Sequence, residues 1–160
     1  MHRRRTFEDN VVFDTPDLML RQSGKLLRVR QTGSDALVTY KGPDEPGKYK
    51  SREEVEVAVS GVGTTALLLE RLGFACVFRY QKYRTEYTRS GGRGIVTLDE
   101  TPIGCFLEIE GAPAWIDSTA RLLGFHAADY ITASYGGLYL ALRKQQGDLP
   151  ADMVFPGRAT

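Results

Sequence analysis

The chain has 160 residues, 42% hydrophobic and 26% charged, which is enough to bury the core of one domain without staples. Its 21 basic and 20 acidic side chains give a formal net charge of +1, so nucleic acid and anionic membranes are not expected partners. No apolar run approaches about 20 residues, the length of a membrane span. No apolar segment follows the basic start His2-Arg3-Arg4-Arg5, as it would in a signal peptide, and we expect a cytoplasmic location.

The first half of the chain is predicted to form strands separated by short turns. Alternating polar and apolar residues predict strands over 6–14, 25–31, 36–41 and 53–59. The segment 32–35 is typical of a hairpin turn, and 42–47, with two prolines and two glycines, is a loop. Neighbouring strands joined in this way favour an antiparallel sheet.

The second half mixes strands with helices. Strands are predicted over 74–88, 95–99 and 104–110, and helices over 64–72, 112–123 and 131–145. The segment 90–94 is predicted to be a turn, and the tail 147–160, which contains Gly and Pro, to pack loosely. We therefore expect a single domain over 1–160, of the α+β class, with an antiparallel barrel or tunnel and three flanking helices.

Charged residues recur at a spacing of two along most of the predicted strands. Because side chains two apart lie on the same face, Arg28 and Arg30 share one face, while Leu27 and Val29 share the other. The charged faces carry the basic residues Arg28, Arg30, Lys41, Arg52, Lys82 and Arg84 and the acidic residues Glu54, Glu56, Asp99, Glu108 and Glu110.

Two arrangements of these faces are open. In an ordinary barrel the apolar faces point inward and the charges lie in solvent. If the apolar helices cover the outer face instead, the charges line a wet interior, where each needs a counter-ion because unpaired buried charge is costly. Arginine forks suit phosphate oxygens, and carboxylates suit hard cations such as Mg²⁺ or Mn²⁺. An interior of this kind would suit a polyphosphate bound with a metal.

The ordered set of motifs resembles the CYTH family, also called triphosphate tunnel metalloenzymes, over about residues 7–145. The matching pieces are Phe7-Glu8-Asp9 to Phe13-Asp14-Thr15-Pro16, Leu26 to Arg30, Thr39 to Pro43, Arg52 to Glu56, Lys82-Tyr83-Arg84, Leu98-Asp99, Gly104 to Glu110 and Ile131 to Tyr135. The last of these pieces resembles the class IV adenylate cyclase branch in particular.

The resemblance implies a tunnel of antiparallel strands with inward charges and a set of site residues. The triphosphate would be bound by Arg28, Arg30, Lys41, Arg52, Lys82 and Arg84. A Mg²⁺ or Mn²⁺ ion would be bound by Asp99, Glu108 and Glu110, supported by Glu54 and Glu56. Lys82, Arg84 and Glu54 would be the catalytic residues. Substrates in this family are ATP, inorganic tripolyphosphate and thiamine triphosphate.

One family feature is missing from the chain. The family opens with a strand reading Glu-x-Glu-x-Lys, and this sequence contains no such motif. If that strand is lost, we expect a tunnel open at one edge, and an unpaired edge favours pairing with a second copy as a homodimer. Three functions therefore stay open: a class IV adenylate cyclase, a triphosphatase, and a triphosphate- or nucleotide-binding module without activity.

Overall fold

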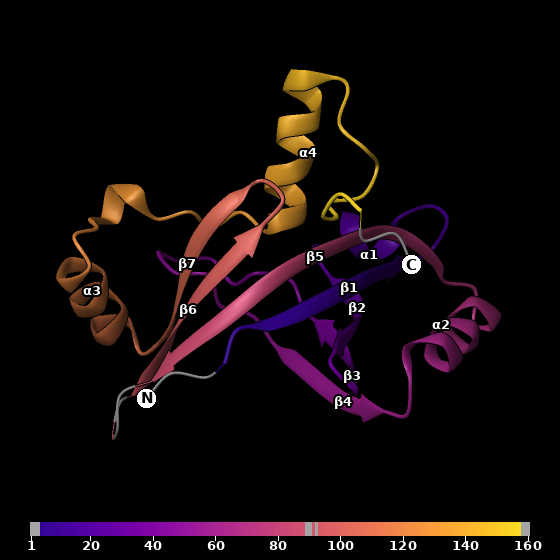
Figure 1. Ribbon diagram of the computed structural model, residues 1–160, viewed down its shortest axis with the longest axis horizontal. Coiled ribbons are helices and arrows are strands. Elements are labelled where there is room, and N and C mark those ends of the chain that lie inside the picture. The colour runs from indigo at the N-terminus through magenta and orange to yellow at the C-terminus, as the bar shows by residue number, and fades with distance from the viewer. Residues whose placement is uncertain (1–3, 89–90, 92, 158–160) are drawn as a thin grey trace.

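The computed structural model describes residues 4–88, 91 and 93–157. Its strands are β1 (Thr6–Asp14), β2 (Leu26–Thr32), β3 (Asp35–Lys41), β4 (Glu54–Val59), β5 (Ala75–Thr88), β6 (Gly94–Thr101) and β7 (Gly104–Gly111). Its helices are α1 (Met19–Gln22), α2 (Val62–Arg71), α3 (Pro113–Leu122) and α4 (Tyr135–Gln146), with a 3₁₀ turn at Ala127–Asp129. Figure 1 shows α2 and α3 toward opposite ends of the molecule.

All seven strands form one antiparallel sheet in the order β4-β3-β2-β1-β5-β6-β7. The outer strands β4 and β7 do not pair with each other in the part of the chain that the structure describes, so the sheet is open. The predicted α+β antiparallel fold with helices at its sides is confirmed, in its open form.

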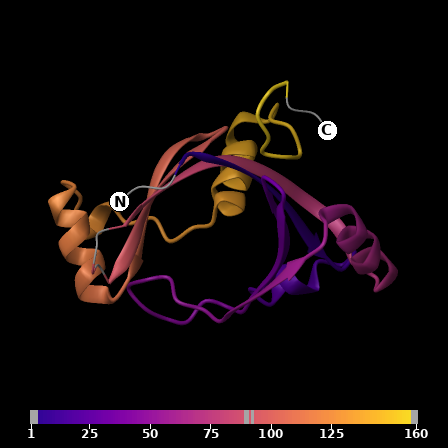
Figure 2. The same cartoon turned by 60° about the horizontal axis from the view of Figure 1, so that its bottom comes forward.

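Helix α2 covers the outer face of β1, β2 and β3. Phe13, Val29 and Leu69 are its buried centre, and Leu27 and Val38 pack against them. These residues are the apolar members of the alternating pattern. The charged members therefore lie on the opposite, concave face, around which the strands curve in Figure 2. The apolar cover supplied by α2 decides between the two arrangements that the sequence left open.

The loop between β3 and β4 crosses beneath the concave face and reaches the far side of the sheet (Figure 2). Lys48 in this loop lies 2.7 Å from the carboxylate of Asp117 on α3. Lys50 donates a 3.3 Å hydrogen bond to the carbonyl of Thr132. The loop thus connects the β3–β4 edge to the segments that follow β7.

Several element boundaries differ from the predictions. Helix α4 begins at Tyr135, four residues later than predicted, because Ser134 caps it by accepting a hydrogen bond from the Gly137 amide. Helix α1 was not predicted. Arg52 precedes β4, outside the strand to which its spacing with Glu54 assigned it. The predicted turn 90–94 falls partly outside the described residues. No helix in the described ranges is long and apolar enough to cross a membrane.

The prediction that the tail packs loosely is wrong. Met153 is fully buried, and its backbone forms two 2.9 Å hydrogen bonds, with Arg79 and Gln81 of β5. Strand β6 pairs with β5 only from Tyr83 onward, so it leaves the earlier part of that edge unpaired. The tail fills this edge, because buried amides need partners.

Candidate functional site

A buried group of charges lies where β5 and β6 pair. The Lys82 ammonium is 2.7 Å from Oδ2 of Asp99, and their side chains are 2% and 0% exposed. Arg84 donates two hydrogen bonds to the same carboxylate, of 2.7 Å and 2.6 Å, in a forked geometry. One carboxylate therefore neutralises two neighbouring cations.

Strands β1 and β2 add a second set of groups beside Lys82. Glu8 of β1 is opposite Lys82 in the register, and its Oε2 atom lies 3.6 Å from the ammonium. The same oxygen is 3.3 Å from Nε of Arg30. Arg30 also donates a 2.8 Å hydrogen bond to Asn10, which is fully buried. These side chains share the concave face because each strand places alternate residues there.

Helix α4 and strand β7 close this group on its other side. The Tyr135 hydroxyl donates a 2.8 Å hydrogen bond to Asp99 Oδ2, and its ring lies 5.3 Å from the Lys82 nitrogen. Arg84 also contacts the carboxylate of Glu108 on β7. The ring of Phe106 packs edge-on against Tyr135 at 5.2 Å, which holds the start of α4 against β7.

A second basic group lies on β2 and β3. Arg28 is 6% exposed and donates 3.1 Å hydrogen bonds to the hydroxyls of Tyr80 and Thr39. Thr39 in turn donates to Glu56, whose Oε1 atom is 3.6 Å from Arg28. Arg28 is thus held by neutral hydroxyls at close range and by a carboxylate only at longer range.

The remaining predicted residues lie toward the two outer edges of the sheet. Lys41 contacts Glu54, which is 43% exposed. Arg52 is 15% exposed, and its Nε lies 3.7 Å from Asp44 in the loop. The structure thus places Lys41 and Glu54 on the concave face as predicted and Arg52 just outside the strands, while Glu110 lies exposed near the end of β7.

The electrostatic environment keeps Asp99 and Arg84 charged and Tyr135 protonated. Burial favours the neutral acid at Asp99, but the hydrogen bond from Arg84 and the charge of Lys82 outweigh it and hold the Asp99 pKa below its usual value. Burial opposes the charge of Arg84, yet the bonds to Asp99 raise its pKa further. Burial, together with the charges of Glu108 and Asp99, raises the Tyr135 pKa, so this hydroxyl stays a donor.

Lys41 behaves differently from the central cations. Burial lowers its pKa, and the nearby charge of Arg28 adds to this effect, while the bond to Glu54 opposes it. A second anion close to Lys41 would favour its protonated form.

The carboxylates fit a hard cation by their chemistry, because Mg²⁺ and Mn²⁺ prefer oxygen ligands. Asp99 and Glu108 lie on neighbouring strands of the concave face, and Glu110 continues that row. In the described residues no three acidic, His or Cys side chains already form a group able to hold a metal. Arg84 donates hydrogen bonds to the carboxylates of both Asp99 and Glu108. A metal ion bound by these two carboxylates therefore requires Arg84 to move toward another anion.

The prediction omitted three polar residues that the structure brings to this face: Glu8, Asn10 and Tyr135. Glu8 and Asn10 are two apart on a predicted strand, so the alternation that identified Arg28 and Arg30 could have identified them too. Tyr135 carried no such signal, because it reaches Asp99 from a helix 36 residues away in the chain.

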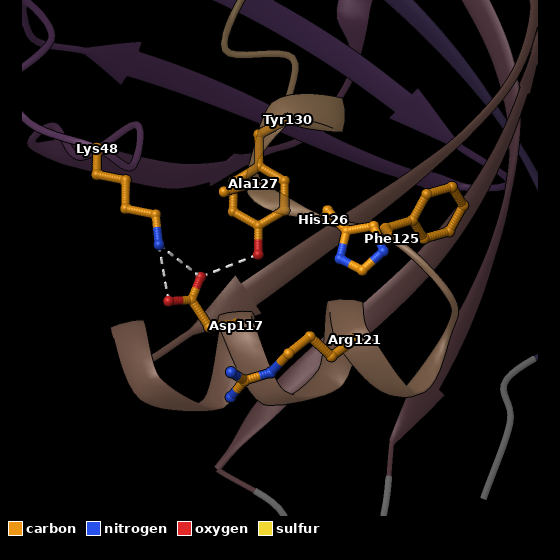
Figure 3. Close-up of a pocket in the computed structure, with 7 residues that line it drawn as sticks. All are labelled: Lys48, Asp117, Arg121, Phe125, His126, Ala127 and Tyr130. Atoms are coloured by element: carbon orange, nitrogen blue, oxygen red, sulfur yellow. Dashed lines mark hydrogen bonds and ion pairs between the residues drawn. The ribbon is translucent and has the colours of Figure 1, made fainter.

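A separate pocket of about 170 Å³ lies where the β3–β4 loop meets α3. Figure 3 shows Lys48 and Tyr130 converging on Asp117, whose carboxylate accepts a 2.9 Å hydrogen bond from the tyrosine. The bond with Lys48 lowers the Asp117 pKa to about 2. The side chains of Lys48 and Asp117 are 49% and 30% exposed, so this pair is a surface contact that anchors the loop.

The concave face of this open antiparallel sheet thus carries buried cations paired with carboxylates. A family model for the CYTH domain matches residues 1–133, and the chain belongs to the CYTH domain family.

Comparison with individual proteins agrees with this assignment. The chain is 28% identical over 120 residues to a protein of Methanocaldococcus jannaschii named as a putative adenylate cyclase, covering 75% of this chain and 68% of that one. The structure of the PH1819 protein of Pyrococcus horikoshii is 29% identical, has a TM-score of 0.76 and shares 89% of this chain and 88% of that chain. A protein from Hippeastrum, named as a putative adenylyl cyclase and described with a dominant triphosphatase activity, is 20% identical with a TM-score of 0.68, and the match covers 94% of this chain and 87% of that one, which shows a shared fold.

Proposed function

We propose that the concave face binds the triphosphate of ATP together with a divalent cation, and that the protein converts ATP to cyclic AMP and pyrophosphate. One observation carries this proposal. Nε of Arg28 is buried and has no hydrogen-bond partner, on a face where Lys82, Arg84 and Arg30 also lie. Buried donors are seldom left unpaired, and an entering phosphate oxygen would satisfy this one.

The cations would bind phosphate by exchanging partners. Lys82, Arg84 and Arg30 are now held by carboxylates on the same face, so triphosphate oxygens can replace those carboxylates without exposing the cations. Lys41 and Arg52 would extend the contact toward the β3–β4 edge. Positioning and charge neutralisation account for most of the catalysis in phosphoryl chemistry.

In the proposed reaction the ribose 3′-hydroxyl oxygen attacks the α-phosphorus. Its proton leaves to a base, a new oxygen–phosphorus bond forms, and the bond to the departing pyrophosphate breaks. The Glu54 side chain is 43% exposed, and Lys41 is the residue with which it forms an ion pair in the described part of the chain. An exposed carboxylate of this kind would be suited to receive the proton. Lys82 and Arg84 would neutralise the charge that develops on the phosphates.

Asp99, Glu108 and Glu110 would hold the metal. Mg²⁺ or Mn²⁺, when bound, would polarise the phosphate and align the attacking oxygen. Arg84 would move from these carboxylates to the phosphates, while Tyr135 would still donate its hydrogen bond to Asp99 and fix the orientation of that carboxylate.

A triphosphatase is the second candidate, in which water attacks instead of the ribose hydroxyl. The similarity to the Hippeastrum protein, which is described with a dominant triphosphatase activity, favours it. Both candidates use the same phosphate-binding residues and differ in the nucleophile.

Product analysis separates the candidates. The protein would be incubated with ATP, tripolyphosphate or thiamine triphosphate, each with Mg²⁺ and with Mn²⁺. Cyclic AMP supports the cyclase, and orthophosphate supports the triphosphatase. Measurable tripolyphosphate binding without any product would indicate a binding module without activity. Absence of both binding and product would refute the proposed site.

A further inference from the structure

The Glu8 carboxylate on the concave face has a buried oxygen that accepts no hydrogen bond. The whole residue is only 5% exposed, and the atom without a hydrogen-bond partner is Oε2. Arg30 Nε at 3.3 Å and Lys82 Nζ at 3.6 Å supply charge but no hydrogen bond. Buried carboxylates usually accept several hydrogen bonds, so this oxygen is placed to accept something that is not part of the chain.

Triphosphate binding would make this situation worse for Glu8. The proposed function moves Lys82 and Arg30 toward phosphate oxygens, and in the described residues these are the two cations that form ion pairs with Glu8 within 4 Å. A buried carboxylate beside several phosphate oxygens without a cation is strongly unfavourable. A cation must therefore enter with the triphosphate or Glu8 must oppose its binding.

The surroundings offer further oxygens for such a cation. Oδ2 of Asp99 lies 2.7 Å from the same Lys82 nitrogen, so Glu8 and Asp99 flank one positively charged position. Oxygen ligands of this kind suit Mg²⁺ and Mn²⁺.

We infer that Glu8 is a ligand of the divalent cation that enters with the triphosphate, which rests on the proposed function. The residue has two opposite effects. It weakens the binding of a metal-free triphosphate, because it competes with the phosphates for Lys82 and Arg30. It strengthens the binding of the metal-bound triphosphate, because it supplies an anionic oxygen to the metal. A carboxylate that served only to hold the strands together would affect both forms alike.

Calorimetry with tripolyphosphate tests this inference. The Kd is measured with EDTA and with saturating Mn²⁺ for the wild-type protein, for Glu8→Gln and for the control Glu70→Gln, which changes an exposed acid on α2. We expect the Kd in EDTA divided by the Kd in Mn²⁺ to be lower in Glu8→Gln than in the wild type by about 10-fold or more. This is the size of effect seen when a metal site loses a supporting group. The Kd of Glu8→Gln in EDTA should be lower than that of the wild type, and the control should match the wild type.

The outcomes separate the two proposals. If wild-type protein binds tripolyphosphate in neither condition, the proposed function fails. If it binds, and Glu8→Gln keeps the wild-type ratio or weakens both forms equally, only the role of Glu8 is overturned. Should Glu8→Gln not fold, Glu8→Asp and Mn²⁺-induced broadening of amide NMR signals in the wild type replace it. Broadening that affects Glu8 and Asn10 first supports the inference, and broadening confined to Glu110 refutes it.

Discussion

Lys82 and Asp99 form a buried ion pair, with Nζ and Oδ2 2.7 Å apart and almost no exposure of either side chain. Removing two charges from water is costly, and buried pairs are often no more stabilising than apolar residues of similar size. The proposed function gives such a pair a role in binding. The carboxylate would neutralise a cation inside the sheet until a more highly charged anion replaces it.

The first prediction concerns triphosphate affinity. Lys82→Ala and Arg84→Ala should each weaken tripolyphosphate binding by about 1.5–3 kcal/mol, the contribution of a hydrogen bond to a charged group. Calorimetry measures the change. Lys144→Ala, at an exposed position of α4, is the matched control and should leave the affinity unchanged. Wild-type affinity in both site variants would contradict the assignment of these cations to the triphosphate.

The second prediction concerns stability and pH. Asp99→Asn should lower the free energy of unfolding at pH 7 by about 3 kcal/mol, because it leaves Lys82 and Arg84 without their shared counter-ion. The folded protein holds the Asp99 pKa below its usual value of 3.8, so the pair stabilises the wild type above that pH. Its contribution is lost as the pH falls through the lower, folded-state pKa.

Urea unfolding of both proteins at pH 7, 4 and 3 checks this pH dependence. The difference between wild type and Asp99→Asn should be largest at pH 7 and should shrink toward acid. A difference that stays constant over this range would mean that folding does not lower the Asp99 pKa.

The third prediction concerns the tail. Met153→Ala should destabilise the protein by about 2–5 kcal/mol, the cost of a large-to-small change in a core. Met153 is fully buried against Tyr80 and Tyr139, so the change leaves a cavity beside β5. Thermal or urea unfolding measures it, with the exposed Asp148→Ala as control. Equal stability of both variants would show that the tail is not part of the core.

The fourth prediction uses two glycines of opposite surroundings. A Cβ at Gly94 would lie 2.5 Å from the Trp115 ring and would also clash with the Glu110 carbonyl, so Gly94→Ala should destabilise by about 1–3 kcal/mol. Gly63 lies inside α2 with nothing within 4 Å of the added carbon. Gly63→Ala should therefore stabilise by about 0.5–1 kcal/mol. Urea unfolding of the two variants should give opposite signs, and equal signs would contradict the packing of α3 on β6 and β7.

Much of the sheet could be predicted because its signals are local. Strand β1 was predicted with its observed bounds, and the hairpin of β2 and β3 to within one residue at each end, since alternation and turn residues act over a few positions. The start of α4 was misplaced because helical periodicity says little about the first turn. The cap at Ser134, which ends the extended segment, decides it.

The sequence by itself determined which side chains share a face, because the two-residue period of a strand is a property of the backbone. It could not decide which face is buried against helices. That depended on α2 packing over Phe13 and Val29, which are more than ten residues apart in the chain. Only the tertiary structure brought Tyr135 to Asp99 and Met153 to β5, because contacts between distant segments depend on how whole elements pack and not on local spacing.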